Sequence, residues 1–117
     1  MSQGIQRNLD ILAAEIYRLS TRVSTFEYNN TARRINGVLS KHTDDLIPMK
    51  SLQAGYLDTL IHNFPPMVKD LLSLDITEVR RLLCHLTTIN DVVMERLTDT
   101  QKRRMLNEEI GAIRFVR

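Results

Sequence analysis

The clearest pattern in this chain is a row of apolar residues that recur at alternating spacings of four and three. The row consists of Ile5, Leu9, Leu12, Ile16, Leu19, Val23 and Phe26. This spacing places all seven residues on one face of an α-helix, and it is the heptad spacing of coiled coils. The a positions are Leu9, Ile16 and Val23, and the d positions are Ile5, Leu12, Leu19 and Phe26. This row, the heptad stripe, predicts a long helix from about residue 4 to residue 28.

The apolar register changes after Phe26. A second row, displaced by two positions, contains Tyr28, Ala32, Ile35, Leu39 and Leu46. Asparagine and threonine are good helix N-caps, so residues 29–31 favour a break that is followed by a second short helix over about 31–41. The alternative is one continuous helix of about forty residues that extends to about residue 41.

Three further helices are predicted from apolar spacing and from capping residues. They cover about residues 48–63, 76–97 and 99–114. Asp75 with Glu78, and Thr98 with Gln101, have the spacing of capping boxes at the starts of the last two. Their inward faces are expected to hold Met49, Leu52, Tyr56 and Leu60, then Val79, Leu82, Leu86, Ile89, Val93 and Leu97, and finally Leu106, Ile110 and Ile113.

The predicted fold class is all-α, because no segment shows the period-two alternation of a β-strand. The 117 residues suffice for one domain with a modest core and not for two. We therefore expect a single helical domain over residues 1–117, a small bundle of four or five helices with a long N-terminal helix.

The charged residues are nearly balanced but unevenly distributed. The net charge is +2, and the two ends of the chain are basic whereas the middle is acidic. Twelve of the sixteen basic residues are arginine, whose planar guanidinium suits carboxylates and phosphates. The local concentrations are Arg33 with Arg34, Arg80 with Arg81, and Lys102 with Arg103 and Arg104. They are candidates for the charged rim of a protein interface or for contacts with nucleic acid.

The sequence contains no pattern of catalytic, cofactor-binding or metal-binding residues. Cys84 and His85 are suggestive neighbours, but consecutive helical residues diverge by about 100° and do not face each other. His42, His62 and His85 lack the spacing of a metal site. We therefore expect no enzymatic activity, no catalytic residue, no cofactor and no metal.

The sequence also predicts a soluble, cytoplasmic protein that does not contact membranes. No window approaches the ~18 uninterrupted apolar residues of a membrane span, and the N-terminal residues lack an apolar signal region. The single cysteine, Cys84, forms no internal disulfide, which agrees with a reducing compartment.

These patterns predict a protein that works through its surfaces. The expected function is that of a non-enzymatic adaptor or regulator, which self-associates through the heptad stripe, with a dimer favoured, and binds another protein to alter its activity or assembly. Packing of the stripe within one chain is the alternative arrangement, because the flanking Ala13 and Ser20 are small. The alternative function is that of a small arginine-rich regulator that binds nucleic acid.

Overall fold

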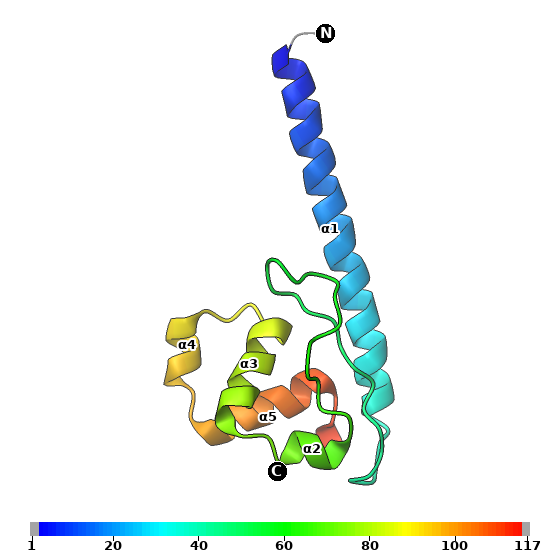
Figure 1. The fold of residues 1–117 in the computed structure, drawn as a ribbon, viewed down its shortest axis with the longest axis vertical. Coiled ribbons are helices and arrows are strands. Elements are labelled where there is room, and N and C mark those ends of the chain that lie inside the picture. Colours follow the sequence, from blue (N-terminus) through cyan, green and yellow to red (C-terminus); the bar gives the residue numbers. More distant parts are fainter. Residues whose placement is uncertain (1–2, 116–117) are drawn as a thin grey trace.

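One long helix projects from a small helical body in the computed structural model of the chain, which describes residues 3–115 (Figure 1). The elements are α1 (Gln3–Asn36), α2 (Val68–Leu72), α3 (Ile76–Leu86), α4 (Asp91–Arg96), α5 (Asp99–Ile110) and the 3-10 helix η1 (Ile113–Phe115). Within these residues there are two isolated antiparallel bridges and no strand. The prediction of an all-α fold with four or five helices is therefore confirmed.

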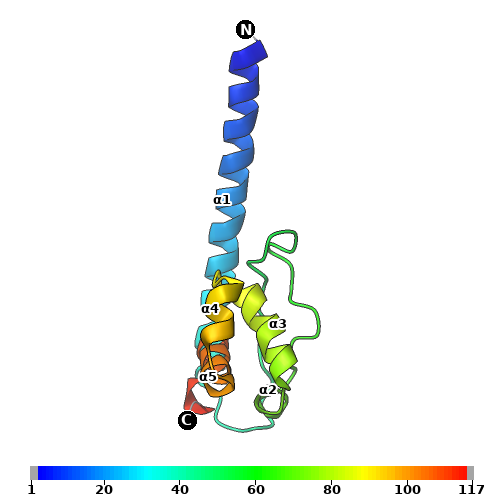
Figure 2. The ribbon, with the colours of Figure 1, turned by 90° about the vertical axis from the view of Figure 1, so that its left-hand side faces the viewer.

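The projecting helix makes the molecule elongated. Its principal extents are 61 × 30 × 20 Å and its radius of gyration is 17.3 Å, whereas a compact domain of this length has a radius of gyration of about 13 Å. Figures 1 and 2, which differ by a quarter turn, both show the N-terminal half of α1 standing clear of the body. All residues of Gln3–Ser20, the projecting segment, are exposed.

The favoured prediction of a helix break at residues 29–31 is wrong, because α1 continues to Asn36. Asn29 does not act as a helix cap; it is only 2% exposed, and its side chain is hydrogen bonded to the main chain of Lys50. The alternative of one continuous helix is correct, although this helix ends before residue 41.

The predicted helix over about residues 48–63 is also wrong, because residues 37–67 form a long connection without a helix. The main chain reverses between Lys50 and Leu60, which form an antiparallel bridge. Tyr56 and Leu60, expected on an inward face, are 56% and 55% exposed. Three residues in this connection adopt positive φ angles, which an α-helix does not accommodate: Gly55, Asp58 and Asn63.

The predicted helix over about 76–97 is divided into α3 and α4. α3 ends at Leu86, and Asn90 then starts α4 as an N-cap whose side chain accepts from the amide of Val93 at 2.9 Å. This restart rotates α4, so that Met94 is fully buried whereas Val93 is 43% exposed.

The predicted starts of α3 and α5 are confirmed by their caps. The Asp75 side chain accepts from the Glu78 amide, and Thr98 and Gln101 form a reciprocal capping box. The end of α5 differs from the expected residue 114, because Gly111 adopts a left-handed conformation that terminates the helix.

The core lies between α3 and α5 and is closed by the connection 37–67 and by α2. Its largest fully buried apolar side chains are Met49, Val68, Val79, Leu82, Leu83, Met94, Leu106 and Ile110. None of them comes from α1, so the core does not depend on the heptad stripe.

Candidate interaction surfaces

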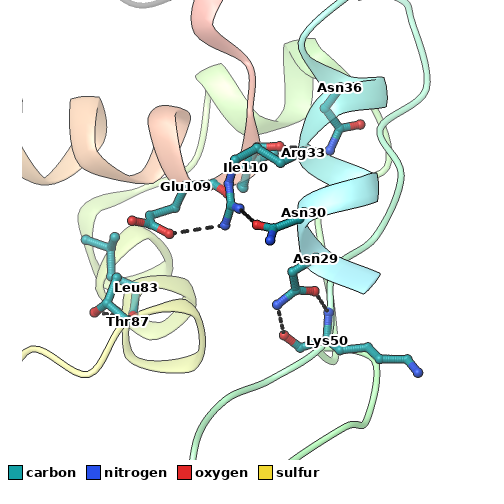
Figure 3. Close-up of polar contacts among 9 residues, drawn as sticks. All are labelled: Asn29, Asn30, Arg33, Asn36, Lys50, Leu83, Thr87, Glu109 and Ile110. Atoms are coloured by element: carbon teal, nitrogen blue, oxygen red, sulfur yellow. Dashed lines mark hydrogen bonds and ion pairs between the residues drawn. The ribbon is translucent and has the colours of Figure 1, made fainter. Parts of the chain in front are cut away.

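α1 is attached to the body by a small and polar face near its C-terminal end. The buried residues of this attachment face are Thr25, Asn29, Ala32 and Asn36. The Asn29 side chain donates to the Lys50 carbonyl at 2.9 Å and accepts from the Lys50 amide at 2.8 Å (Figure 3). Asn36 makes the same pair of contacts with Ile47, and it also donates to the Ile110 carbonyl at 3.0 Å. These bonds hold the connection and the end of α5 against the helix.

The attachment face was not predicted from the sequence. The signal is present, because Thr25, Asn29, Ala32 and Asn36 follow one another at helical spacings of four, three and four. However, a row of small and polar residues is also typical of a solvent-exposed helix face. A buried attachment face differs from a solvent-exposed face only in the partners of its two asparagines. These partners are main-chain groups of Lys50 and Ile47, which lie further along the sequence.

Most of the heptad stripe lies on the part of α1 that extends away from the body, and its last residue, Phe26, lies where α1 meets the body. The exposed fractions of its residues run from 43% at Phe26 to 63% at Ile16. Figures 1 and 2 show no other segment beside the N-terminal half of the helix. Within the described part of the chain, the stripe residues from Ile5 to Leu19 therefore do not pack against the body, and antiparallel packing of this part of the stripe inside one chain is not observed.

The stripe and the attachment face point in different directions. Thr25 is fully buried whereas its neighbour Phe26 is 43% exposed, and consecutive residues of an α-helix are rotated by about 100°. Attachment of α1 to the body therefore leaves the apolar face of the helix accessible along its length.

Charged residues beside the stripe interact along the same helix. Glu15 and Arg18 form an ion pair, and the guanidinium of Arg22 lies 5.9 Å from the ring centre of Phe26. Exposed pairs of this kind contribute little to stability. Their positions matter more, because Glu15 and Arg22 occupy g positions, where charges face a partner helix in a coiled coil.

An open groove of about 450 Å³ begins at Phe26, the last residue of the stripe. Its walls come from the connection, from the turn between α3 and α4, and from α5. The apolar part of the lining includes Leu52, Leu86, Ile89 and Met105, and the acidic part is Glu108 and Glu109. The apolar surface therefore continues from the projecting helix onto the body.

The arginine pair at the end of α1 contacts α5. Arg33 donates from Nε to the Glu109 carbonyl at 2.8 Å, and its Nη2 lies 3.4 Å from the Glu109 carboxylate (Figure 3). Arg34 is exposed, and its Nη2 lies 3.4 Å from the Thr31 hydroxyl. Arg33 thus helps to fix α1 to the body.

The arginine pair on α3 is occupied by contacts within the protein. Arg81 forms an ion pair with Glu78 at 2.8 Å and donates to the His62 carbonyl at 2.8 Å. Arg80 lies 3.8 Å from Glu95 of α4. Of the basic cluster on α5, Arg103 donates to the Leu74 carbonyl at 2.6 Å. Several predicted rim residues therefore have structural contacts, which the sequence pattern did not reveal.

Ser51 and His85 form the arrangement that most resembles a nucleophile and its base. The Ser51 hydroxyl lies 2.6 Å from Nδ1 of His85, but Ser51 is fully buried, where a substrate does not reach its hydroxyl. Burial, followed by the positive charge of Arg81, lowers the pKa of His85 below its usual value. Cys84 is half-buried against the core. We interpret the Ser51–His85 contact as structural, because it holds the connection against α3.

No group of three His, Cys, Asp or Glu side chains within residues 3–115 is arranged to hold a metal ion. Among the helices that the structure describes, none is long and apolar enough to cross a membrane.

Comparison with known proteins supplies no relative. No protein family model matches the chain, and no curated protein or solved structure is significantly similar to it.

Proposed function

We propose that this chain is a non-enzymatic interaction protein that pairs with a second copy of itself through the heptad stripe and binds another protein to regulate its activity or assembly. The observation that carries the proposal is the exposure of the seven heptad-spaced apolar residues of α1, five of which lie on the projecting segment that stands clear of the body. Most of the stability of a helix in a protein comes from the packing of its apolar face. Contiguous exposed apolar surface of this kind marks an interaction site.

The stripe is large enough to sustain association. Full burial of a Leu, Ile, Val or Phe side chain contributes about 1.5–3 kcal/mol, and the stripe residues begin roughly half exposed. Two copies bring fourteen such side chains together, which yields roughly 10–20 kcal/mol. Loss of translational and rotational freedom costs about 4–15 kcal/mol. At the midpoints of these two ranges, burial of the stripe exceeds the loss of freedom, which favours association.

The charges beside the stripe favour a second copy in parallel orientation. In a parallel pair, each g residue faces the e residue five positions later on the other helix. Arg22 at g then faces Glu27 at e of the second copy, and this attractive pair occurs twice. Glu15 faces Ser20, so no like charges oppose each other in this register.

The groove beside Phe26 supports the second half of the proposal, the binding of another protein. It lies where the paired helices would meet the body, and it combines an apolar lining with Glu108 and Glu109. A partner segment with an apolar face and basic residues complements this groove.

Measurement of the molar mass tests self-association. The wild-type protein at about 50 μM should give twice 13.6 kDa by light scattering or sedimentation equilibrium. Leu12→Asp places a charge in the seam and should weaken pairing by about a hundredfold or more. Ala14→Asp introduces the same residue at an exposed f position and is the matched control, which should remain a dimer.

The structure separates loss of pairing from loss of folding. Because the projecting segment makes no contribution to the core, the body of the Leu12→Asp variant should keep the thermal transition of its monomeric fold. A wild-type protein that is monomeric at about 50 μM, or an Ala14→Asp variant that dissociates as readily as Leu12→Asp, contradicts the proposal.

A further inference from the structure

Phe26 belongs to two surfaces of the molecule. It is the last residue of the heptad stripe, and it also lines the open groove of about 450 Å³ on the body. The rest of the groove comes from the connection, from the turn between α3 and α4, and from α5. The seam of the proposed pair and the wall of the groove therefore share one side chain.

The groove combines an apolar lining with a negative rim. None of the described residues that line it is lysine or arginine. Glu108 and Glu109 belong to the last turn of α5, which contains no basic residue. The C-terminal end of a helix carries the negative pole of its dipole, so carboxylates there are stabilised by a nearby cation. The apolar side chains beside this rim are those of Phe26, Leu52, Leu86, Ile89 and Met105.

The chain supplies one cation to this rim. Arg33 donates to the Glu109 carbonyl at 2.8 Å, and its Nη2 lies 3.4 Å from the Glu109 carboxylate. Glu108, the preceding residue, is exposed. A basic side chain of a bound segment can therefore reach Glu108 while apolar side chains of the same segment enter the groove. This charge pattern selects a basic amphipathic segment of another protein as the occupant.

Pairing through the stripe would change the groove in two ways. In a parallel pair, d residues of the same number lie in one layer, so Phe26 of the second copy would extend the apolar wall. The other change is electrostatic. In the single chain the guanidinium of Arg22 lies 5.9 Å from the ring centre of Phe26, where it repels a basic ligand at the groove. In the pair it would face Glu27 of the second copy, whose charge opposes its own.

We propose, given the pairing argued above, that this groove binds a basic amphipathic segment of another protein and binds it more tightly when the chain is paired. The groove of a single chain lacks the part of its wall that the second copy supplies. Because coupling between two binding events is reciprocal, the bound segment also tightens the pairing. The partner would thereby control the assembly of this protein.

Fluorescence anisotropy with a labelled leucine–lysine peptide of about 14 residues, with leucine at helical spacing, tests this linkage. Affinities are compared at protein concentrations at which the wild type is paired. Leu12→Asp should lower the affinity at least about fivefold, although Leu12 does not line the groove and lies about 21 Å from Phe26 along the helix. Ala14→Asp adds the same charge and retains pairing, so its affinity should stay within about twofold of the wild type, because a charge this distant is screened.

A second pair of variants assigns the peptide to the groove. Glu108→Gln should weaken peptide binding at least about fivefold at low salt. Asp45→Asn removes the same charge from an exposed residue that does not line the groove, and it should change the affinity less than about twofold. Both variants should keep the wild-type molar mass and thermal midpoint, because both side chains belong to exposed residues.

The failures of linkage, pairing and groove binding are distinguishable. Equal peptide affinity of the wild-type dimer and of monomeric Leu12→Asp overturns the linkage and leaves the pairing intact. A wild type that is monomeric by molar mass overturns the pairing and the linkage together. Equal effects of Glu108→Gln and Asp45→Asn, or no peptide binding at about 100 μM, overturn the groove as the site. Weaker pairing of Glu108→Gln without peptide also overturns it, because the second copy would then occupy the groove.

Discussion

The side chain of Asn29 pairs with the main chain of Lys50 through two hydrogen bonds, at 2.9 and 2.8 Å, as a neighbouring strand would. Seven residues further along α1, Asn36 pairs in the same manner with Ile47. Seven helical residues span about 10.5 Å, and three residues of extended chain span about 10.2 Å. Two asparagines one heptad apart are therefore in register with an extended segment that runs antiparallel to the helix.

We expect the replacement of Asn36 by alanine to destabilise the body. The change leaves the Ile47 amide and the Ile110 carbonyl without their partner in a buried position, and each lost partner costs about 1–3 kcal/mol. The free energy of unfolding, measured by urea titration, should fall by about 2–4 kcal/mol. Asn8→Ala, on the projecting segment, is the control and should change this value by less than about 0.5 kcal/mol.

Gly111 should tolerate no side chain. It has a φ angle of 97°, and a Cβ atom there would lie 2.2 Å from the Arg33 carbonyl oxygen. Gly111→Ala should lower the free energy of unfolding by about 2 kcal/mol or more, because α1 and the end of α5 must separate. By contrast, Gly4 has no atom within 4 Å of such a Cβ, so Gly4→Ala should be neutral or favour the helix by up to about 1 kcal/mol. Thermal unfolding of both variants compares them; equal midpoints would contradict the close approach of Gly111 and Arg33.

Asp58 should contribute to the acid sensitivity of the fold. The hydrogen bond from Lys50, and then that from Thr25, lowers the pKa of Asp58 below 3.8. Its contribution is therefore fully present above pH 3.8 and is lost as the pH falls through the lowered value. In Asp58→Asn, which retains a residue that accepts positive φ, stability should fall less steeply below this pH. Urea titrations of the wild-type protein and of this variant across the pH range measure the difference.

The titration of His85 acts in a higher pH range. Because burial and Arg81 lower its pKa from 6.5, the unfolded chain takes up the proton first as the pH falls. The wild-type protein should therefore lose stability as the pH falls from 6.5 toward the lowered pKa. Above pH 6.5 His85 is neutral in both the folded and the unfolded chain, so its titration should not change the free energy of unfolding there. His85→Gln should flatten the slope, whichever way it shifts absolute stability through the lost Ser51 contact. A variant with an unchanged slope would contradict this assignment.

The elements that the sequence predicted correctly are those that local interactions determine. Asp75 and Thr98 cap their helices through residues three positions later, so the relevant partner is visible in the sequence itself. The exposure of the stripe, however, depends on which face of α1 the body contacts. The spacing of apolar residues does not predict this face.

Two of the incorrect predictions share a physical cause, which is the dominance of distant main-chain partners over local preference. Asn29 has the side chain of a helix cap, but Lys50 supplies its partners. The segment over residues 48–63 has helical apolar spacing, but residues with positive φ and the bridge from Lys50 to Leu60 reverse it.

Exchange of charges between Arg22 and Glu27 tests the orientation of the proposed dimer. In the parallel register these residues face each other across the seam, so Arg22→Glu should create two repulsive pairs and weaken the dimer by about tenfold or more at low salt. Glu27→Arg alone should have a similar effect. Combination of the two changes restores opposite charges and should recover most of the lost affinity, measured by sedimentation equilibrium.

An additive loss in the double variant would contradict the parallel register, since the two residues would then not face each other. A disulfide provides the independent measurement. In a Cys84→Ser background, Leu12→Cys places two thiols in the same d layer of a parallel pair, so air oxidation should produce a covalent dimer. Ala14→Cys, on the outer face, should remain largely unlinked. In an antiparallel pair Leu12 would face an a residue of the other helix, so neither cysteine variant would cross-link efficiently, and the pairing would be retained with the opposite orientation.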